Sequence, residues 1–451
     1  MTLPQDFIQQ MQALLGTEQS ESFFDALNGE APTSIRLNPS KPTQHLDGQP
    51  VAWCPEGRYL SSRPSFTLDP LFHAGTYYVQ EASSMYLWHV VRQCVGEQPV
   101  LALDLCAAPG GKSTLLHSAL PTASFIVSNE IVRHRADILR ENIIKWGSPH
   151  NMVTNNAAAD FQALGTMFDL ILCDVPCSGE GMFRKDPDAI TEWSLQNVDM
   201  CQQRQRDILT DIWPCLRPGG LLIYSTCTYN TKENEENVRW IINELGAEAI
   251  DSHPDPSWNI TGSLLPGFDA PVCRFLPHKT RGEGLFMAVL RKTDTTTLPR
   301  PKPKKAQKTG NLRIPALLDL WMQPNNGTIT TIDGQSFTHL SSSSLPPCPA
   351  LTTLNRGTDI ATAKGKDRLQ PAHSLAMSSL LNPAAFPSAE ISEQEALAYL
   401  RTEALTLPPD TPRGHVLLTY QQHPLGFVNN LGSRANNLYP SAWRIRMKAQ
   451  G

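Results

Sequence analysis

Between about residue 70 and residue 292, short apolar runs alternate with stretches in which apolar residues recur at helical spacing. Such runs are typical of strands buried on both faces of a parallel sheet, and the stretches between them are typical of the covering helices. The pattern therefore predicts a doubly wound α/β domain. The expected strands are residues 77–80, 100–105, 125–130, 168–174 and 221–226, and the expected helices are residues 83–94, a segment ending at 143, and residues 204–216.

The stretch from Val100 to Leu120 interrupts this pattern with a turn of small residues. Pro109, Gly110 and Gly111 prevent a continuous helix and let backbone N–H groups approach a ligand. The helix that follows points its N-terminus into the loop, where polar and charged ligand groups bind well. The stretch therefore predicts a binding turn of nucleotide size.

Three ligands compete for this loop. A phosphate-binding loop requires glycine where Cys106 stands, and a dinucleotide fingerprint requires a G-x-G-x-x-G pattern that residues 107–111 do not supply. S-adenosylmethionine fits better, because its charged methionine end can lie over the loop while an acid at the end of the next strand holds its ribose hydroxyls. Glu130 ends that strand and is the candidate acid.

The chain on either side of this domain is organised differently. Residues 1–69 are expected to form a small N-terminal α/β module of RNA-binding type, with two helices and a strand over 34–38. Residues 293–312 are rich in proline and basic residues, which predicts an extended linker. Residues 313–451 contain strand-like pieces separated by turns, and we expect them to leave donor binding to residues 70–292.

Composition narrows the class of protein. The chain has 451 residues, a net charge of −5 and a pI of about 6.2, so it lacks a global basic field for nucleic acids. A local field is expected in residues 401–451, which carry an excess of basic side chains: Arg401, Arg413, Arg434, Arg444, Arg446 and Lys448. The absence of a long apolar run and of a basic segment followed by an apolar block predicts a cytoplasmic protein.

The ten cysteines are scattered, which is typical of reduced thiols rather than of a disulfide framework. Cys173 and Cys177 are closely spaced, but no second pair of ligands lies near them at zinc-site spacing. We therefore expect no metal.

Two of the cysteines follow predicted strands at the edge where open α/β sheets bind ligands. Cys177 follows the strand that ends at Asp174, and Cys227 follows the strand that ends at Thr226. Two thiols beside a methyl-donor loop suit methylation at C5 of a pyrimidine, because C5 becomes nucleophilic only after a thiolate adds to C6. Asp174 is the candidate acid near N3, since burial can keep a carboxyl partly protonated. The residues alone leave open which thiol attacks and which assists release.

These motifs resemble those of the NOL1/NOP2/Sun family of RNA cytosine-5 methyltransferases, and within it the bacterial RsmF-type enzymes that methylate 16S ribosomal RNA. The likeness rests on LDLCAAPGGKST, Asn129-Glu130, DVPCSGEGMFRK and YSTCTYNTKENEENV. It implies a Rossmann-like S-adenosylmethionine-dependent methyltransferase domain in which Cys227 is the nucleophile and Cys177 assists product release. The donor site that it implies consists of Cys106, Ala107, Ala108, Pro109, Gly110, Gly111, Lys112, Glu130 and Asp174.

The C-terminal residues are similar to the PUA-like RNA-binding region of RsmF-type enzymes, which implies ribosomal RNA or the small ribosomal subunit as the partner of a monomeric enzyme. One departure lies between Glu130 and Asp174. The family places an acid near the adenine where this chain reads NNAAAD over residues 155–160, so either Asn156 or a shifted Asp160 takes that place. The sequence also leaves open transfer RNA or DNA as the substrate, and a ribosome assembly factor without catalysis.

Gly110→Val is expected to abolish S-adenosylmethionine binding, because the new side chain would occupy the space where the ligand meets the backbone. Calorimetric titration of the folded variant measures this. Unchanged affinity would rule out the assignment of the loop.

Overall fold

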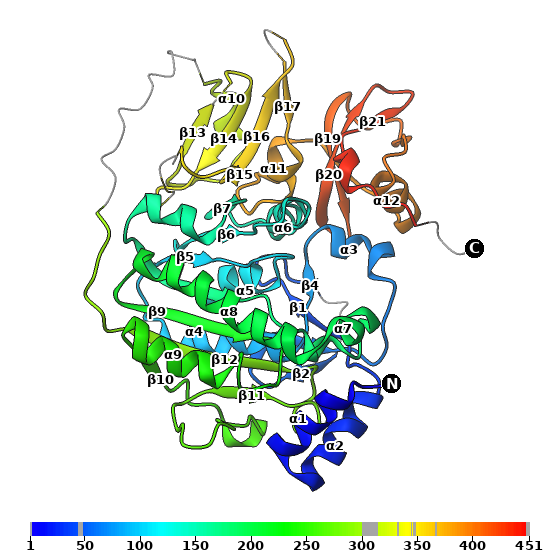
Figure 1. The fold of residues 1–451 in the computed structure, drawn as a ribbon. Helices are drawn as coiled ribbons and strands as arrows, with labels where there is room; N and C mark the ends of the chain where they lie inside the picture. Colours follow the sequence, from blue (N-terminus) through cyan, green and yellow to red (C-terminus); the bar gives the residue numbers. More distant parts are fainter. Residues whose placement is uncertain are drawn as a thin grey trace.

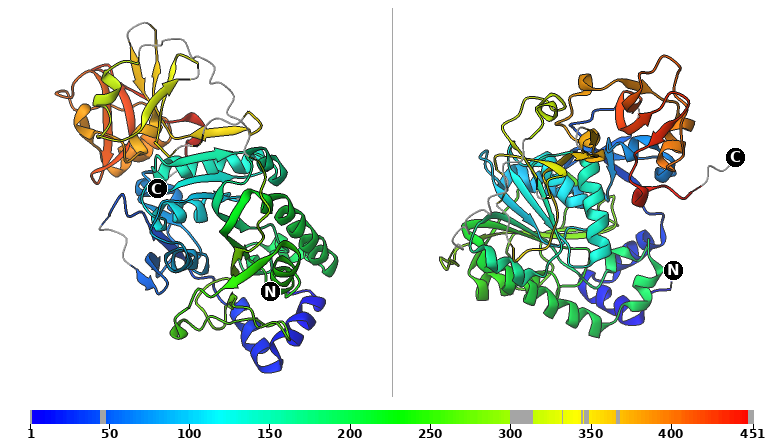
Figure 2. Two further views of the ribbon diagram at one scale, coloured as in Figure 1. Left: turned by 90° about the vertical axis from the view of Figure 1, so that its left-hand side faces the viewer. Right: turned by 90° about the horizontal axis from the view of Figure 1, so that it is seen from above.

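The computed structural model describes residues 2–43, 48–299, 314–331, 333–343, 345, 349–365 and 368–447. Most of the expected basic linker and Lys448 lie outside the described residues. Figure 1 and the left view of Figure 2 show the central sheet in the middle of the molecule, with helices α1 and α2 at one end and the C-terminal strands at the other.

The N-terminal part consists of a helical hairpin and a small sheet. The first helix buries Phe7 and Met11, and the second buries Phe23 and Leu27, so both predicted amphipathic faces pack against the protein. The sheet has the strand order β2-β3-β1-β4 and takes its last strand from residues beyond Asp69. The elements are α1 (Gln5–Leu15), α2 (Thr17–Asn28), β1 (Ser34–Leu37), β2 (Gln49–Val51), β3 (Cys54–Tyr59), α3 (Pro70–His73) and β4 (Tyr77–Val79).

The central sheet confirms the expected doubly wound α/β domain. Five strands in the order β9-β8-β5-β6-β7 are parallel, and β12 and β10 extend the sheet antiparallel beyond β9. Its strands are β5 (Leu101–Asp104), β6 (Phe125–Asn129), β7 (Asn151–Thr154), β8 (Phe168–Asp174), β9 (Leu216–Thr226), β10 (Ala247–Ile250), β11 (Cys273–Phe275) and β12 (Leu285–Lys292).

Helices cover both faces of this sheet, as the near-continuous apolar strands require. Val90 and Leu115 belong to the core on one face, and Leu209 and Ile241 belong to the core on the other. These helices are α4 (Leu87–Cys94), α5 (Gly111–Ala119), α6 (Arg133–Trp146), α8 (Leu195–Ile212) and α9 (Glu235–Leu245), whereas α7 (Pro187–Glu192) packs with the N-terminal helices.

Two four-stranded sheets make up most of the C-terminal region, in the orders β13-β14-β16-β17 and β18-β19-β20-β21. Alternate residues of β19 join different cores, with Val416 and Leu418 on one side and Leu417 on the other. The two sheets therefore share buried surface. The elements are α10 (Leu317–Leu320), β13 (Thr328–Thr331), β14 (Ser336–Leu340), β16 (Thr358–Ala363), β17 (Leu369–Pro371), α11 (His373–Met377), β18 (Ser388–Glu390), α12 (Glu393–Leu400), β19 (Gly414–Tyr420), β20 (His423–Asn430) and β21 (Ala435–Asn437).

One strand of the C-terminal region belongs to the central sheet instead. Strand β15 (Thr353–Arg356) pairs antiparallel with β7 and covers that edge of the sheet (Figure 1). The C-terminal region therefore contributes one strand to the sheet of the donor domain. A parallel sheet leaves unpaired backbone groups at its edge, and here a segment about 200 residues further along the chain pairs with them.

A buried arginine joins the N-terminal sheet to the central domain. Arg36 on β1 is fully buried, and its guanidinium donates to Gln80 Oε1 (2.8 Å) and to Thr114 Oγ1 of α5 (2.6 Å). It also stacks on Trp146, 4.4 Å from the ring centroid. Burial lowers its pKa to about 10, so the guanidinium stays charged at neutral pH.

Arg36→Ala is expected to lower the free energy of unfolding by about 2–4 kcal/mol, because it leaves buried polar partners without a donor. Arg92→Ala, at an exposed position on α4, is the matched control and should change it by less than about 0.5 kcal/mol. Urea denaturation measures both, and equal stability of the two variants would contradict the proposed role of Arg36.

Candidate functional site

The predicted donor loop runs between β5 and α5. Gly110, at the N-terminus of α5, has φ +118, and a Cβ there would lie 3.3 Å from Leu139 Cδ1. Two side chains of α6 hold the loop from outside: Arg135 donates to Ala108 O (3.0 Å) and Asn142 donates to Pro109 O (2.8 Å). The loop is therefore a fixed turn that requires glycine at position 110. The Cβ of a valine there would face Leu139 and Asn142 of α6, so Gly110→Val would distort the loop, whereas the sequence led us to expect that it would fill the ligand space.

Asp104, at the end of β5, is a functional candidate that the sequence analysis missed. Its carboxyl is fully buried, and Ser113 Oγ donates to Oδ2 (2.6 Å), but Oδ1 has no hydrogen-bond partner among the described residues. Burial raises the pKa of Asp104 to about 7, against the opposing effect of the Ser113 hydrogen bond. An unpartnered buried carboxylate oxygen beneath the donor loop fits a positively charged ligand group such as the ammonium of S-adenosylmethionine. The sequence feature that could have identified Asp104 is the position of this acid at the end of an apolar strand.

Glu130 follows β6, the neighbouring strand, and is 3% exposed. Its Oε1 accepts from Val132 N (2.9 Å), and its Oε2 lies 3.2 Å from Arg135 Nη1. The next residue, Ile131, is an apolar side chain that is 63% exposed. An acid and an apolar side chain side by side at a strand end match what a ribose and an attached base need.

Lys112 and Asp174 connect the donor loop to the next strand. Lys112 Nζ donates to Asp174 Oδ2 (2.8 Å), and Ser225 Oγ of β9 donates to Oδ1 (2.7 Å). Burial opposes the charge on Lys112, but the Asp174 carboxylate outweighs it and raises the pKa of Lys112. Asp174 is 32% exposed and accepts at both oxygens, so it lacks the enclosed apolar surroundings that the sequence argument assumed.

The two predicted thiols lie in contact. Cys177 Sγ and Cys227 Sγ are 3.2 Å apart, although their residues follow different strands. The contact with Cys227 is the main cause, ahead of burial, of a Cys177 pKa well above the ordinary value. Cys177 therefore keeps its proton and can donate it in a hydrogen bond to the sulfur of Cys227.

Buried carboxylates hold the two loops that carry the thiols. Glu180 accepts from Tyr229 N (2.6 Å) and from Gln10 Nε2 of α1 (3.0 Å), so the N-terminal helix also reaches this network. Glu233 accepts from Ser178 N (3.0 Å) and Gln205 Nε2 (2.7 Å). Each loop is thus bonded to the other.

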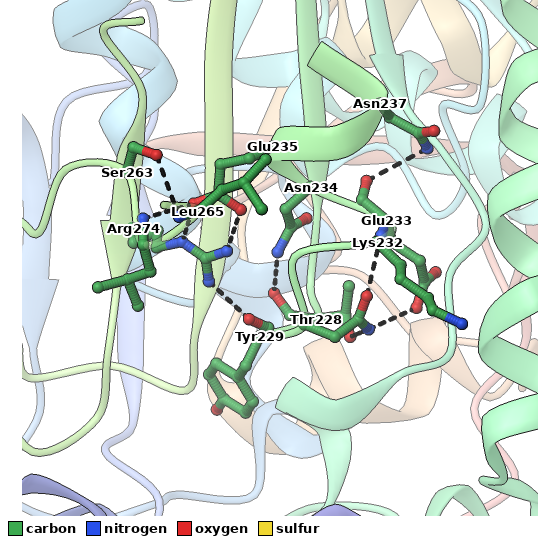
Figure 3. Close-up of polar contacts among 12 residues, drawn as sticks. Thr228, Tyr229, Lys232, Glu233, Asn234, Glu235, Asn237, Ser263, Leu265 and Arg274 are labelled. Carbon is green, nitrogen blue, oxygen red and sulfur yellow. Dashed lines mark hydrogen bonds and ion pairs between the residues drawn. The ribbon is translucent and has the colours of Figure 1, made fainter. Parts of the chain in front are cut away.

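Figure 3 shows the second loop, between Thr228 and Asn237. Asn234 Nδ2 donates to Thr228 O (2.9 Å), and the fully buried Glu235 forms an ion pair with Arg274, whose guanidinium also donates to Tyr229 O (2.6 Å). These residues act as positioning groups that we did not expect from the sequence. The sequence feature that could have identified them is the high density of acids and amides in the stretch after Cys227.

The region expected near the adenine contains Asn156 and Asp160. Asn156 is buried and bonds the backbone of Thr352 through both atoms of its amide, whereas Asp160 is exposed and accepts from Ala157 N (2.9 Å). The backbone N of Asn156 donates to Asn129 Oδ1 (3.0 Å), and Asn129 directly precedes Glu130 in the chain. Of the two alternatives, Asn156 is the one tied to the donor side.

Neither metal ligation nor membrane insertion has support in the described part of the chain. It contains no cluster of three or more His, Cys, Asp or Glu side chains that could hold a metal ion. None of its helices is long and apolar enough to cross a bilayer.

Models of three protein families match successive parts of the chain. The N-terminal domain of 16S rRNA methyltransferase RsmF matches residues 3–82, the 16S rRNA methyltransferase RsmB/F matches residues 95–291, and the methyltransferase RsmF PUA domain matches residues 386–445. The chain is 33% identical to ribosomal RNA small subunit methyltransferase F of Cronobacter sakazakii, over 87% of this chain and 83% of that protein. It is 31% identical to the protein of the same name from Escherichia coli O127:H6, over 97% and 95%.

Solved structures share the fold. The crystal structure of PH0851 matches with a TM-score of 0.58 and 25% identity, covering 64% of this chain and 66% of that one. NSun6 from Pyrococcus horikoshii, solved with SFG, matches with a TM-score of 0.55 and 22% identity over 64% of this chain and 98% of that one.

Asp104→Asn tests whether the buried carboxylate holds a charged donor group. In the wild type, affinity for S-adenosylhomocysteine should fall as the pH drops from 8 to 6, because the carboxyl takes up a proton near pH 7 and loses its charge. The variant should bind about 10- to 100-fold more weakly at pH 8 and lose this pH dependence. Calorimetry at both pH values measures it, and a variant with wild-type affinity and the same pH dependence would exclude Asp104 from the site.

Proposed function

Because the chain belongs to the RsmF family of 16S ribosomal RNA methyltransferases, we propose that it methylates C5 of a cytosine through a covalent bond between Cys227 and C6 of the base. The family and the S-adenosylmethionine-dependent fold expected from the sequence are confirmed. The observation that carries the residue assignment is the 3.2 Å contact between Cys177 and Cys227, at the sheet edge that also holds the donor loop.

Residues of the donor loop and of two strand ends would hold S-adenosylmethionine. Asp104 suits its ammonium, the backbone of residues 106–112 lines its methionine end, and Glu130 suits the ribose hydroxyls. When bound, S-adenosylmethionine supplies an electrophilic methyl group. The residues of the chain fix its orientation toward the neighbouring strand ends, where the thiols lie.

Attack begins at Cys227. Its thiolate forms a bond to C6 of the cytosine, and the electron pair of the C5–C6 double bond moves so that C5 becomes nucleophilic while N3 takes up a proton. Asp174 and Lys112 are placed to serve the polar edge of the base: the carboxylate accepts an amino hydrogen, the ammonium beside it holds that carboxylate in place, and the proton that N3 takes up comes from solvent.

Release requires Cys177. After methylation a base removes the C5 proton, the electron pair of that C–H bond restores the C5–C6 double bond, and Cys227 leaves as a thiolate. Because Cys177 keeps its proton, it assists by donating its S–H to the departing sulfur. In this mechanism Cys177 is not itself the base that removes the C5 proton.

The C-terminal region supports RNA as the substrate class. Its residues 386–445 match a PUA domain, and residues 401–451 carry six basic side chains against two acidic ones. We propose that the protein acts as a monomer in the cytoplasm on 16S rRNA or the small ribosomal subunit. Strand β15 supports the monomer, because it covers the edge of β7 that a second copy could otherwise pair with.

The two thiols make opposite predictions. Cys227→Ala should lower methyl transfer by about 10⁴-fold or more and form no covalent RNA adduct. Cys177→Ala should still attack and methylate but release slowly, so a protein–RNA species should accumulate and survive denaturing electrophoresis.

The double variant is the control and should lose that species, because trapping requires Cys227. Radiolabelled methyl transfer to 16S rRNA and to DNA, with gel analysis of the adduct, measures these outcomes. If Cys227→Ala stays active while Cys177→Ala is inactive without an adduct, the roles are reversed and the DNA-type mechanism becomes the better explanation.

A further inference from the structure

We propose that the C-terminal region forms part of the donor site, with Asn156 as a positioning residue that links strand β15 to the donor loop. Donor affinity would then depend on residues about 200 positions beyond the methyltransferase motifs. This inference rests on the assignment of residues 106–112 and Glu130 to S-adenosylmethionine.

The first link joins the donor loop to Asn156 through Asn129. The side chain of Asn129, which is 2% exposed, donates to Leu105 O (3.1 Å) and to Asn156 O (2.9 Å) and accepts from Asn156 N (3.0 Å). Its backbone carbonyl accepts from Ala107 N (2.8 Å). Movement at Asn156 therefore reaches the loop through short, buried hydrogen bonds.

The second link joins Asn156 to the C-terminal region. Its Oδ1 accepts from Thr352 N (2.9 Å) and its Nδ2 donates to Thr352 O (3.2 Å), so one side chain satisfies both backbone groups of the residue before β15. Asn155 N donates to the same carbonyl (2.9 Å). We call this chain of contacts the Asn129–Asn156–Thr352 bridge.

Apolar packing makes the same connection. Leu354 of β15 packs in one cluster with Ala107 and Ala108 of the donor loop and with Leu139 of α6. Leu354 stands where the register between β15 and β7 shifts, and such an irregularity adds one residue to a strand and redirects its side chain. Strand β15 thus supports the donor loop from its outer side, opposite the side that the ligand would contact.

The bridge also explains why this chain departs from the family pattern. A carboxylate at position 156 has no hydrogen to donate, and it would face Thr352 O at about the 3.2 Å that now separates a donor from an acceptor. Thr352 O would keep its hydrogen bond from Asn155 N, but only an amide at position 156 can accept from Thr352 N and also donate to Thr352 O. In this chain, position 156 serves the contact with the C-terminal region.

Binding of S-adenosylhomocysteine to full-length variants tests the inference. Asn156→Ala and Asn156→Asp should each weaken the affinity about tenfold, the loss expected when a buried hydrogen-bonded pair is broken. Leu354→Ala should weaken it several-fold, and it serves as the second test if an Asn156 variant does not fold. Thr353→Ala is the matched control on the same strand, since its side chain is exposed, and it should change the affinity less than twofold.

Hydrogen exchange separates positioning from stability alone. In the wild type, binding of S-adenosylhomocysteine should slow exchange of the backbone amides of residues 352–356, and in Asn156→Ala this response should disappear. Wild-type affinity in folded Asn156→Ala and Leu354→Ala, or no response at 352–356 in the wild type, would overturn the inference. If the wild type itself does not bind S-adenosylhomocysteine, the assignment of the donor site fails instead.

Discussion

The parallel pairing of β8 between β5 and β9 is the constraint on which the site depends. It places Asp104 opposite Leu172 and Asp174 opposite Ser225, so three strands end at one edge within hydrogen-bonding reach of each other. Carboxyl ends of parallel strands leave a crevice where the following loops diverge. The donor loop follows β5, and each thiol follows one of the other two strands. The order of the strands therefore brings the loop and both thiols to one edge of the sheet.

The thiol loops need a second constraint, because a strand end fixes only where a loop begins. Glu180, Glu233 and Glu235 are all fully buried, and each accepts several hydrogen bonds or pairs with a cation. A buried carboxylate without such partners would cost several kcal/mol or more, so the loops are held in the one arrangement that satisfies all three. The thiols are thereby kept in contact without a covalent bond.

The outer parts of the chain stabilise the same edge. Arg36 bonds the N-terminal sheet to α5 behind the donor loop, Gln10 of α1 reaches Glu180, and Thr352 bonds Asn156. Two of these contacts come from the N-terminal part and one comes from the C-terminal region, and each ends within a few residues of a proposed site residue. The geometry of the site therefore depends on how the whole chain is assembled, and a methyltransferase domain cut free of its neighbours would lose three supports at once.

The sequence by itself determined the α/β class and the family, and it pointed to the donor loop and the two thiols that we propose for the site, because these depend on local patterns: apolar strands, a Pro-Gly-Gly turn, and short motifs in fixed order. Only the tertiary structure decided the rest. The 3.2 Å contact of Cys177 with Cys227 depends on which strands are neighbours, and the unpartnered oxygen of Asp104 depends on what is packed around it. The role of Asn156 depends on β15, a strand that pairs across about 200 residues. Pairing between strands that are distant in the chain produces no periodic pattern in the sequence near either strand. Backbone hydrogen bonds depend on where the two strands lie in space, and the side chains that a sequence records do not specify that position.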